Sequence, residues 1–451
     1  MKCTSSGLQR VTEFILNTDA EDIPSSTLQQ SALQLLDTLG ICAAATPMTA
    51  GVIGRDIATK LYAAADITTA ANMLFDGRAV SLAGALYAAA NQTDNLDGHD
   101  GYNPTKGHVG VVVSPALAIL AQGRQALTGR DALAALVIGY EVAGRAGIAL
   151  HASVSDYHTS GAWHGLGVVA MAARLRNHST DQLRHSLGIA EYHGPRSQMM
   201  REIANPTMLH DGAAWGGLSA MSAVIAAEAG FTGAPAVTVE AEDAAAHWDD
   251  LAHVWQTDLQ YIKPYPVCRW AHAAIDAARE LCQVHQLEAE DIAAVSIGSF
   301  ENAVALYPGM PSTTSQAQYS MAFAVATIIQ HGHIGLEHIS GRGLSDPQVA
   351  SIVDRIETRV EPRHEQRYPE GRWADVEFKL RDGRRLSSGD VHARGGPERP
   401  YDESDIVSKY EAFAIPVLGA SRAERLRDAV LALNTKDALF SAVSDCLYDP
   451  V

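Results

Sequence analysis

The densest group of chemistry-capable side chains lies in one short polar stretch. It reads Asp94-Asn95-Leu96-Asp97-Gly98-His99-Asp100 and continues to Lys106-Gly107-His108. Carboxylates and imidazoles together can give and take protons near neutral pH. The Gly, Asn and Pro residues predict a loop, and capping of a neighbouring helix would need only one of these polar residues. The stretch therefore favours an acid–base site, with a helix-capping turn as the alternative.

A second candidate segment starts at Lys263. It reads Lys-Pro-Tyr-Pro-Val-Cys-Arg-Trp-Ala-His and ends at His272. Two prolines at alternate positions exclude helix and predict a stiff, extended strut. The alanine-rich stretch 271–281 then predicts a helix, whose N-terminal dipole favours anions. A carboxylate-binding site and a loop with solvated charges both fit this pattern.

Three more residues stand in suggestive places. His158 comes just before a small-residue helix, whose N-terminus would lower the pKa of the imidazole and suit it as a general base. A histidine bonded to the backbone is the alternative. Arg201, with Arg196, could clamp carboxylates or lie on a solvated face. His210 follows in the segment 205–212.

Motifs for metals and cofactors are absent from the sequence. There is no His-Glu-x-x-His, no Walker A loop and no Gly-x-Ser-x-Gly elbow. Gly165-Leu166-Gly167 does not continue as a dinucleotide fingerprint. Cys268 and His272 stand four apart, but no second pair of ligands flanks them. We therefore expect no metal and no cofactor, and keep a zinc enzyme as the minor alternative.

Composition limits the partners. Lys and Arg number 34 against 52 Asp and Glu, a net charge of −18. Such a chain repels nucleic acid and anionic membranes, so an anionic substrate would need a local basic pocket. The most apolar stretch, 132–150, contains Glu141 and Arg145 and predicts no membrane span. The N-terminal residues Met1–Ser6 lead into no apolar signal region, and the five cysteines form no Cys-x-x-Cys. A reducing, cytoplasmic location is expected.

The surrounding pattern predicts the elements that position these groups. Apolar residues at helical spacing predict helices over 27–45, 111–122, from Asp131 onward, 161–175, 212–229 and 315–330. Alternation predicts strands over 292–298, 356–360 and 373–380, the last turning at Asp382-Gly383 into a hairpin. Gly395-Gly396-Pro397 predicts a hinge, helices resume at Ser404, and 441–451 is expected to be a frayed tail. The fold class is therefore mainly α, with a small α+β part.

Together these segments resemble the MmgE/PrpD family, which contains 2-methylcitrate dehydratases, cis-aconitate decarboxylases and iminodisuccinate epimerase. The resemblance covers nearly the whole chain. The matching segments, in order, are Asp94–His99, His108 with its following apolar helix, Tyr157–Gly161, Phe231–Gly233, Lys263–His272 and Gln318–Val325.

The resemblance implies a large helical domain built from residues 1–267 and 398–451. A small α+β domain, 268–397, is inserted between these two pieces, and a cofactor-free site lies in the cleft. Homodimers are usual in the family. The catalytic residues implied are Asp94, His108, His158 and Lys263. The substrate-binding residues expected are His99, Arg201, His210, Arg269 and His272.

The expected activity is proton removal or delivery next to a carboxylate of a small di- or tricarboxylate. His158 is the leading acid/base, and Lys263 holds a carboxylate. A lyase resembling 2-methylcitrate dehydratase or cis-aconitate decarboxylase is favoured. Departures from the family pattern pull toward an epimerase of an iminodisuccinate-like compound. They are Thr207 and His210 where family lyases have a lysine, and Phe323 in place of a tyrosine. Val109 in place of proline is a further departure from the family pattern. A non-catalytic binding protein is the third alternative.

Overall fold

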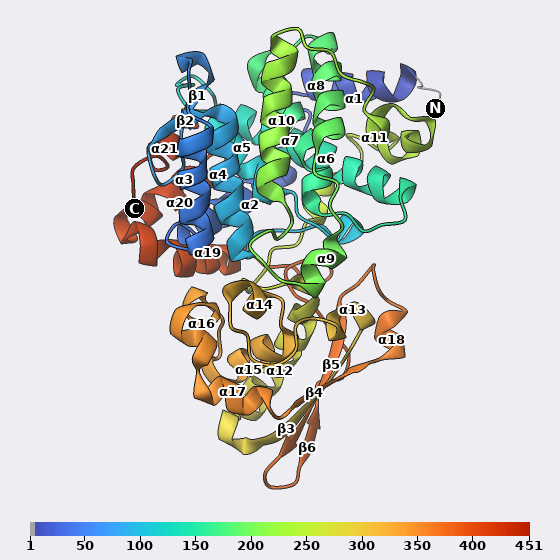
Figure 1. Cartoon of the computed structure of the whole chain (residues 1–451), viewed down its shortest axis with the longest axis vertical. Coiled ribbons are helices and arrows are strands. Elements are labelled where there is room, and N and C mark those ends of the chain that lie inside the picture. Colours follow the sequence, from blue (N-terminus) through green and yellow to red (C-terminus); the bar gives the residue numbers. More distant parts are fainter. Residues whose placement is uncertain (1–4) are drawn as a thin grey trace.

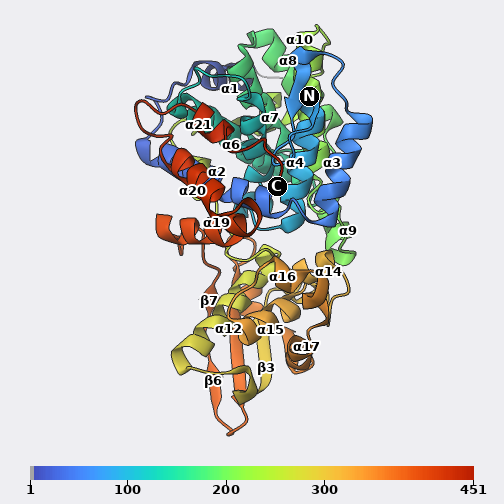
Figure 2. The same ribbon diagram turned by 90° about the vertical axis from the view of Figure 1, so that its left-hand side faces the viewer.

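The computed structural model describes residues 5–451, so Cys3 and the first part of the N-terminal segment lie outside the described residues. The described chain forms two lobes, a large helical one and a smaller one with a sheet (Figure 1). A view from the side shows the same division (Figure 2). The expected fold class, mainly α with a small α+β part, is confirmed.

The large lobe is built from both ends of the chain. Its N-terminal elements are α1 (Ser5–Asn17), α2 (Ser25–Ala44), α3 (Thr49–Leu61), β1 (Ala70–Asn72), β2 (Ala79–Ser81), α4 (Leu82–Leu96), α5 (Gly110–Leu120), α6 (Gly129–Ser153), α7 (Gly165–Arg176), α8 (Thr180–His193), α9 (Met199–Ala204), α10 (Ala213–Glu228) and α11 (Val237–Glu240). Its C-terminal helices are α19 (Glu403–Leu418), α20 (Ala420–Leu431) and α21 (Ser441–Ser444).

The small lobe lies between them in sequence. Its helices are α12 (His272–His285), α13 (Glu301–Val304), α14 (Thr314–Gln318), α15 (Met321–His331), α16 (Leu336–Ile339), α17 (Pro347–Val353) and α18 (Pro362–Glu365). Its strands are β3 (Ile292–Ser299), β4 (Ile356–Val360), β5 (Trp373–Leu380), β6 (Arg385–Ser387) and β7 (Val391–His392).

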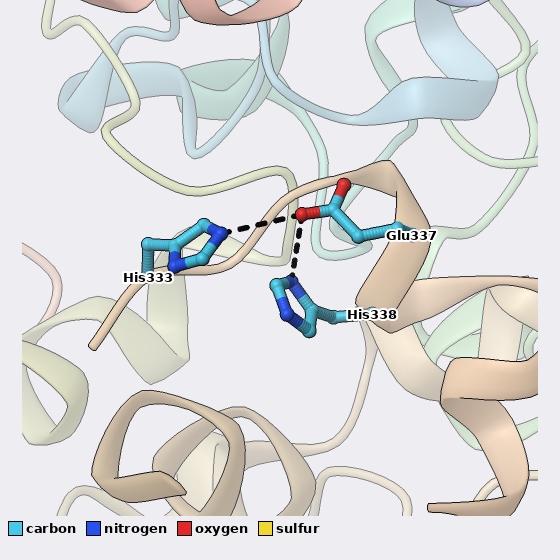
Figure 3. A group of neighbouring side chains, drawn as sticks. All are labelled: His333, Glu337 and His338. Carbon is cyan, nitrogen blue, oxygen red and sulfur yellow. Dashed lines mark ion pairs between the residues drawn. The ribbon is translucent and has the colours of Figure 1, made fainter. Parts of the chain in front are cut away.

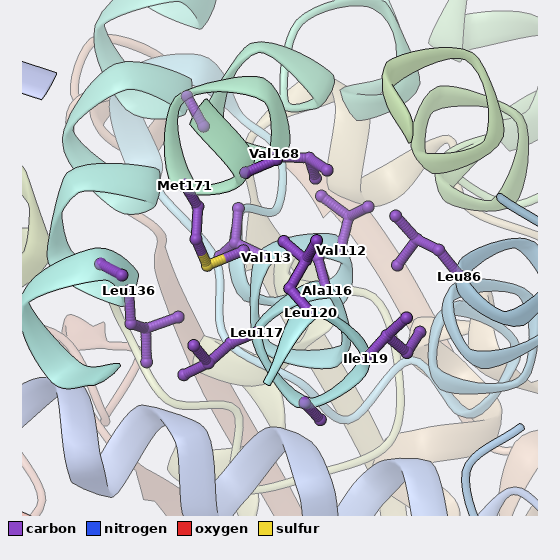
Figure 4. Packing of buried hydrophobic residues seen from close by; sticks show 14 of the residues in the cluster. Leu86, Val112, Val113, Ala116, Leu117, Ile119, Leu120, Leu136, Val168 and Met171 are labelled. Atoms are coloured by element: carbon purple, nitrogen blue, oxygen red, sulfur yellow. The ribbon is translucent and has the colours of Figure 1, made fainter. Parts of the chain in front are cut away.

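The core of the large lobe centres on α5. Every residue of this helix is buried, as its nearly all-apolar sequence predicts. Leu86 of α4, Leu136 of α6 and Met171 of α7 surround it (Figure 4). Small residues let the neighbouring helices approach closely. A Cβ on Gly167 would lie 2.3 Å from the Gly139 oxygen, so the crossing of α6 and α7 requires glycine at position 167.

The small lobe holds a five-stranded mixed sheet. Its order is β4-β3-β5-β6, with β7 pairing with β5. β3 and β4 are parallel, and β3 and β5 are antiparallel with Val295 opposite Phe378. Val376, Phe378 and Leu380 are buried, which confirms the alternation expected for this strand.

The chain passes between the lobes at two neighbouring points. Ile262 N donates to Gly395 O at 2.9 Å where the chain leaves and returns. Gly395 has a φ of 94°, and a Cβ there would lie 2.0 Å from the Ile262 oxygen. Only glycine fits this crossing, which lies at the Gly395-Gly396-Pro397 segment predicted to be a hinge. Beyond it, α19 packs against α2.

Three local expectations differ from the structure. The helix expected over 315–330 is interrupted, because the Ser320 hydroxyl accepts from Phe323 N and starts a new helix. The helix expected over 161–175 becomes regular only at Gly165. The C-terminal tail is not frayed, since Val443 and Leu447 are fully buried and Tyr448 OH donates to Ala118 O.

One described helix is long and apolar enough to cross a bilayer. It is α6, and 94% of its most apolar window is buried inside the protein. This burial is typical of a core helix.

Candidate active site

The acid–base loop begins where α4 ends. Asp94 occupies the last turn of α4, and Asp97 ends the helix in the left-handed conformation, with a φ of 55°. Both side chains are buried. Gly101 and Tyr261 exchange two backbone hydrogen bonds of 2.9 and 2.8 Å, which fixes the loop beside the segment that carries Lys263.

Lys263 is fully buried beneath this loop. Its Nζ forms an ion pair with Asp97 Oδ1 and donates to the Asp97 backbone oxygen at 3.1 Å. Residues 264–267 after the lysine form consecutive bends and not the extended strut expected from the two prolines.

Two imidazoles are oriented by one backbone oxygen. The Asp100 carbonyl lies 3.1 Å from His99 Nδ1 and 2.7 Å from His108 Nδ1. A carbonyl only accepts, so both rings carry the proton on Nδ1 and present a free lone pair on Nε2. The rings meet edge to face, with centroids 4.6 Å apart. Burial lowers the pKa of both histidines well below its usual range, so both are neutral.

Each of these imidazoles faces a buried carboxyl group. His99 Nε2 lies 3.8 Å from Asp94 Oδ1, and His108 Nε2 lies 3.7 Å from Asp211 Oδ2. Burial and the nearby Asp211 raise the pKa of Asp94 well above its usual range. Burial raises the pKa of Asp211 to about 7, against the effect of the Ser160 hydroxyl that donates to it. The site therefore holds two imidazole–carboxyl pairs suited to proton transfer near neutral pH.

A cavity of about 810 Å³ opens onto this group. Asp94, Thr159 and His210 line it, with Arg201 and Trp215 among its other lining residues. A larger cavity of about 970 Å³ lies between α19 and the small lobe, but none of the imidazole–carboxyl pairs lines it. Because Asp94 of one imidazole–carboxyl pair lines the smaller cavity, the candidate active site lies there.

His210 forms part of the cavity wall. It has a φ of 45°, and neither ring nitrogen is paired in a hydrogen bond within the described chain. Burial lowers its pKa to about 4, so it is neutral and supplies no fixed positive charge. Its ring packs 5.6 Å from that of Tyr319. Phe323, one turn later, is buried in the core of the small lobe.

The structure thus brings together Asp94, His99, His108, His210 and Lys263. Arg201 lies on α9 at the exposed rim of the cavity.

Three residues expected at the site have other surroundings. The His158 ring bonds Asp156 O through Nδ1 at 2.9 Å and lies beside His151, which is the backbone-bonded alternative. Arg269 donates to the backbone oxygens of Arg394 and Ala393, and His272 Nε2 lies 3.0 Å from Val267 O. None of the three lines the cavity, and of the five grouped residues Asp94 and His210 do.

Four residues at the site were not among the site residues predicted from the sequence, although Asp97 and Asp100 belong to the polar stretch described there. They are Asp97, Asp100, Ser160 and Asp211. Asp100 is held by Gly110 N at 2.9 Å and by the Tyr140 hydroxyl. The sequence signal for Asp211 was its position beside His210, but its pairing with His108 depends on a contact across about a hundred residues.

Metal-type groupings lie elsewhere in the described residues. Two clusters have ligand atoms close enough to hold an ion, and both belong to the small lobe, away from the imidazole–carboxyl pairs. The chemistry that the candidate site can perform with its own groups is proton transfer beside a buried lysine.

Comparison with known proteins agrees with this architecture. The MmgE/PrpD N-terminal domain model matches residues 9–249, and the MmgE/PrpD C-terminal domain model matches residues 265–435. The chain is also 23% identical over 465 residues to cis-aconitate decarboxylase from Aspergillus terreus (strain NIH 2624 / FGSC A1156). That alignment covers 93% of this chain and 91% of that protein. The two domain models span both lobes, and the chain therefore belongs to the MmgE/PrpD family.

Proposed function

We propose that the protein is a cofactor-independent lyase that acts on a small di- or tricarboxylate, in the manner of a cis-aconitate decarboxylase or a 2-methylcitrate dehydratase. The observation that carries the proposal is the set of two imidazole–carboxyl pairs held on one carbonyl beside a buried lysine. The similarity to a cis-aconitate decarboxylase supports the lyase class.

The geometry favours His108 over His158 as the general base. His108 Nε2 is unprotonated, its side chain is 12% exposed, and Asp211 Oδ2 lies 3.7 Å from Nε2, on the side of the ring where it can accept the proton that this nitrogen takes. Asp94 lines the cavity and its raised pKa keeps it protonated, so it is the natural acid. Proton removal next to a carboxylate produces an enediolate, whose charge the Lys263 ammonium would stabilise.

An epimerase is the second candidate. Two separate imidazole–carboxyl pairs can serve two faces of one carbon, one removing a proton and the other returning it. The positive charge at the site also falls short of what a tricarboxylate would need. Lys263 is already paired with Asp97, and His210 is neutral. These observations favour a smaller or less charged substrate for this alternative.

Proton NMR in D2O separates the candidates. The pure protein would be incubated with 2-methylcitrate, citrate, cis-aconitate, tartrate and iminodisuccinate. A new alkene signal or loss of CO2 identifies the lyase and its substrate. Deuterium at the α-carbon of an otherwise unchanged skeleton identifies the epimerase. Ligand binding without turnover or exchange would instead support a non-catalytic member.

We also propose a homodimer in which the face of α8 and α10 is buried. Trp215 and Phe231 are 51% and 61% exposed there, beside a groove of about 440 Å³ lined by apolar residues of both helices. Exposed aromatic patches of this kind mark protein interfaces. Light scattering should give twice the 48.0 kDa chain mass, and Trp215→Glu should return it to the monomer value.

A further inference from the structure

The turn between α15 and α16 brings together three side chains that ligate transition metals (Figure 3). His333 Nε2 lies 3.3 Å from Glu337 Oε1, and His338 Nδ1 lies 3.2 Å from the same oxygen. The two rings meet edge to face with centroids 4.7 Å apart. One ligand atom from each residue lies within 4.8 Å of the others. A tetrahedral ion with ligands at about 2 Å needs ligand atoms roughly 3.4 Å apart, so small side-chain rotations suffice.

The local backbone builds this grouping. The one-turn helix α16 places Glu337 and His338 side by side, and Gly335 allows the carboxylate to fold over the turn. A Cβ at position 335 would lie 2.4 Å from Glu337 Oε2. Gly335 N donates to His338 Nδ1 at 3.0 Å, a bond that an ion bound at this nitrogen would replace.

Charge distinguishes this turn from the second metal-type cluster. In that cluster His364 lies 2.9 Å from Asp375, but Arg359, Arg363 and Arg367 already neutralise Asp375 and Asp390. Within residues 5–451, Glu337 forms ion pairs with His333 and His338 only. Among the described residues no arginine or lysine pairs with Glu337, so its carboxylate can serve as a ligand without losing such a partner.

We propose that His333, Glu337 and His338 bind a divalent transition-metal ion of the Zn²⁺ class. Two imidazole nitrogens and one carboxylate oxygen suit Zn²⁺, Ni²⁺ or Co²⁺ better than Ca²⁺ or Mg²⁺, which prefer oxygen ligands. His331 stands behind His338, with ring centroids 4.6 Å apart, and its Nε2 lies 3.0 Å from Asp346. This pair supports the ligand ring, as outer groups do in metal sites. His333 is 68% exposed, so the ion keeps an open position toward water.

The proposed ion would lie in the wall of a cavity between the two lobes. His333 and Glu337 line the cavity of about 970 Å³ between the lobes, which α19 closes from the other side with Lys409 and Phe413. The ion would therefore brace the small-lobe wall of this cavity. It lies apart from the imidazole–carboxyl pairs, so the basal reaction does not require it.

Cobalt titration tests the proposal. The metal-free protein should bind one Co²⁺ per chain with a visible ligand-field spectrum, and Zn²⁺ should displace it. The double variant His333→Ala/His338→Ala should bind at least about tenfold more weakly, and Glu337→Gln should also lose affinity. His253→Ala, an exposed histidine of the large lobe, is the matched control and should bind as the wild type does.

A stability readout keeps the test independent of activity. Zn²⁺ should raise the melting temperature of the wild type but not of the double variant, because binding to the folded state stabilises it by mass action. Equal melting of the two metal-free proteins would show that the variant is folded. Absence of stoichiometric Co²⁺ binding at submillimolar concentration, or unchanged binding by the double variant, would overturn the proposal.

Discussion

Lys263 and Asp97, 166 positions apart in the sequence, form a buried ion pair directly beneath the acid–base loop. The pair joins the segment before α12 to the end of α4, so one contact connects the two segments that the sequence marks as functional. A buried pair contributes little net stability, but loss of one partner leaves an uncompensated charge.

Lys263→Met should therefore lower the free energy of unfolding by about 3–5 kcal/mol and abolish turnover, because Asp97 is left buried and unpaired. The double variant Asp97→Asn/Lys263→Met should recover most of the stability but none of the activity. Urea unfolding and turnover assays measure both quantities. A single variant as stable as the wild type would show that the pair is not buried as described.

His108→Ala should reduce kcat/KM by at least about 10²-fold, the lower range for loss of a general base. Asp211→Asn should have an effect in the same direction, since it removes the carboxyl group that faces His108 Nε2. The matched variant is His158→Ala, for which we expect less than about a tenfold loss, because that ring bonds Asp156 O and forms no ion pair within residues 5–451. A larger loss from His158→Ala than from His108→Ala would return the catalytic role to His158.

The pH dependence of stability should report on His210. Burial lowers the pKa of His210 to about 4, below the value of roughly 6.5 in the unfolded chain. Its contribution to the stability of the folded state is therefore fully present above pH 6.5 and is lost as the pH falls through 4. The unfolding free energy of the wild type should therefore fall, relative to His210→Gln, by roughly 2–4 kcal/mol between these limits. Denaturant titrations at several pH values measure this difference. His253→Gln, an exposed site, should leave the pH dependence unchanged, and a flat difference for His210→Gln would contradict the neutral state.

The acidic groups act in the opposite direction. Burial raises the pKa of Asp211 and of Asp100 to about 7, above the pKa near 4 of an aspartate in the unfolded chain. Their contribution to the stability of the folded state is therefore present below pH 4 and is lost as the pH rises through 7. Comparison of each variant with the wild type, and not the total pH profile, separates these effects from that of His210.

Gly110→Ala should destabilise the protein by about 1–3 kcal/mol and reduce activity. A Cβ there would lie 2.4 Å from both Asp100 Oδ2 and the Tyr140 hydroxyl, and would push aside the residue whose carbonyl orients His99 and His108. The control is Gly139→Ala in the adjacent buried helix α6, where the nearest atom lies at 3.4 Å. That variant should be neutral or slightly stabilising in thermal melts, as Gly-to-Ala changes within helices are. Equal effects at the two positions would argue against a specific role of the Asp100 carbonyl.

Periodicity and turn chemistry were sufficient to predict most of the fold. The apolar α5, the alternating β5 and the glycine crossing at Gly395 follow from local pattern alone. The break at Ser320 and the anchored tail could not be predicted in this way. The first depends on competition between a cap and a continuous apolar pattern, and the second on contacts of Leu447 and Tyr448 with distant residues.

The sequence predicted which residues belong to the site better than it predicted which of them contact one another. Asp94, His99 and His108 stand out because they crowd one loop. The roles of Asp97 and Asp211 depend on contacts to Lys263 and His108 across the fold. His158 carried the same local signal as a base, but the direction of its ring is set by the Asp156 carbonyl, which the sequence pattern does not reveal.

The return of the chain to the large lobe has a consequence for its synthesis. Because α19 and α20 pack against α2, the part of the α2 surface that they cover stays exposed until the ribosome has passed residue 431. The small lobe, by contrast, has its own sheet and core complete in sequence by β7. The inserted lobe can therefore fold first, while the N-terminal helices wait for the last part of the chain to emerge. Truncated translation products would expose a helical surface that chaperones recognise.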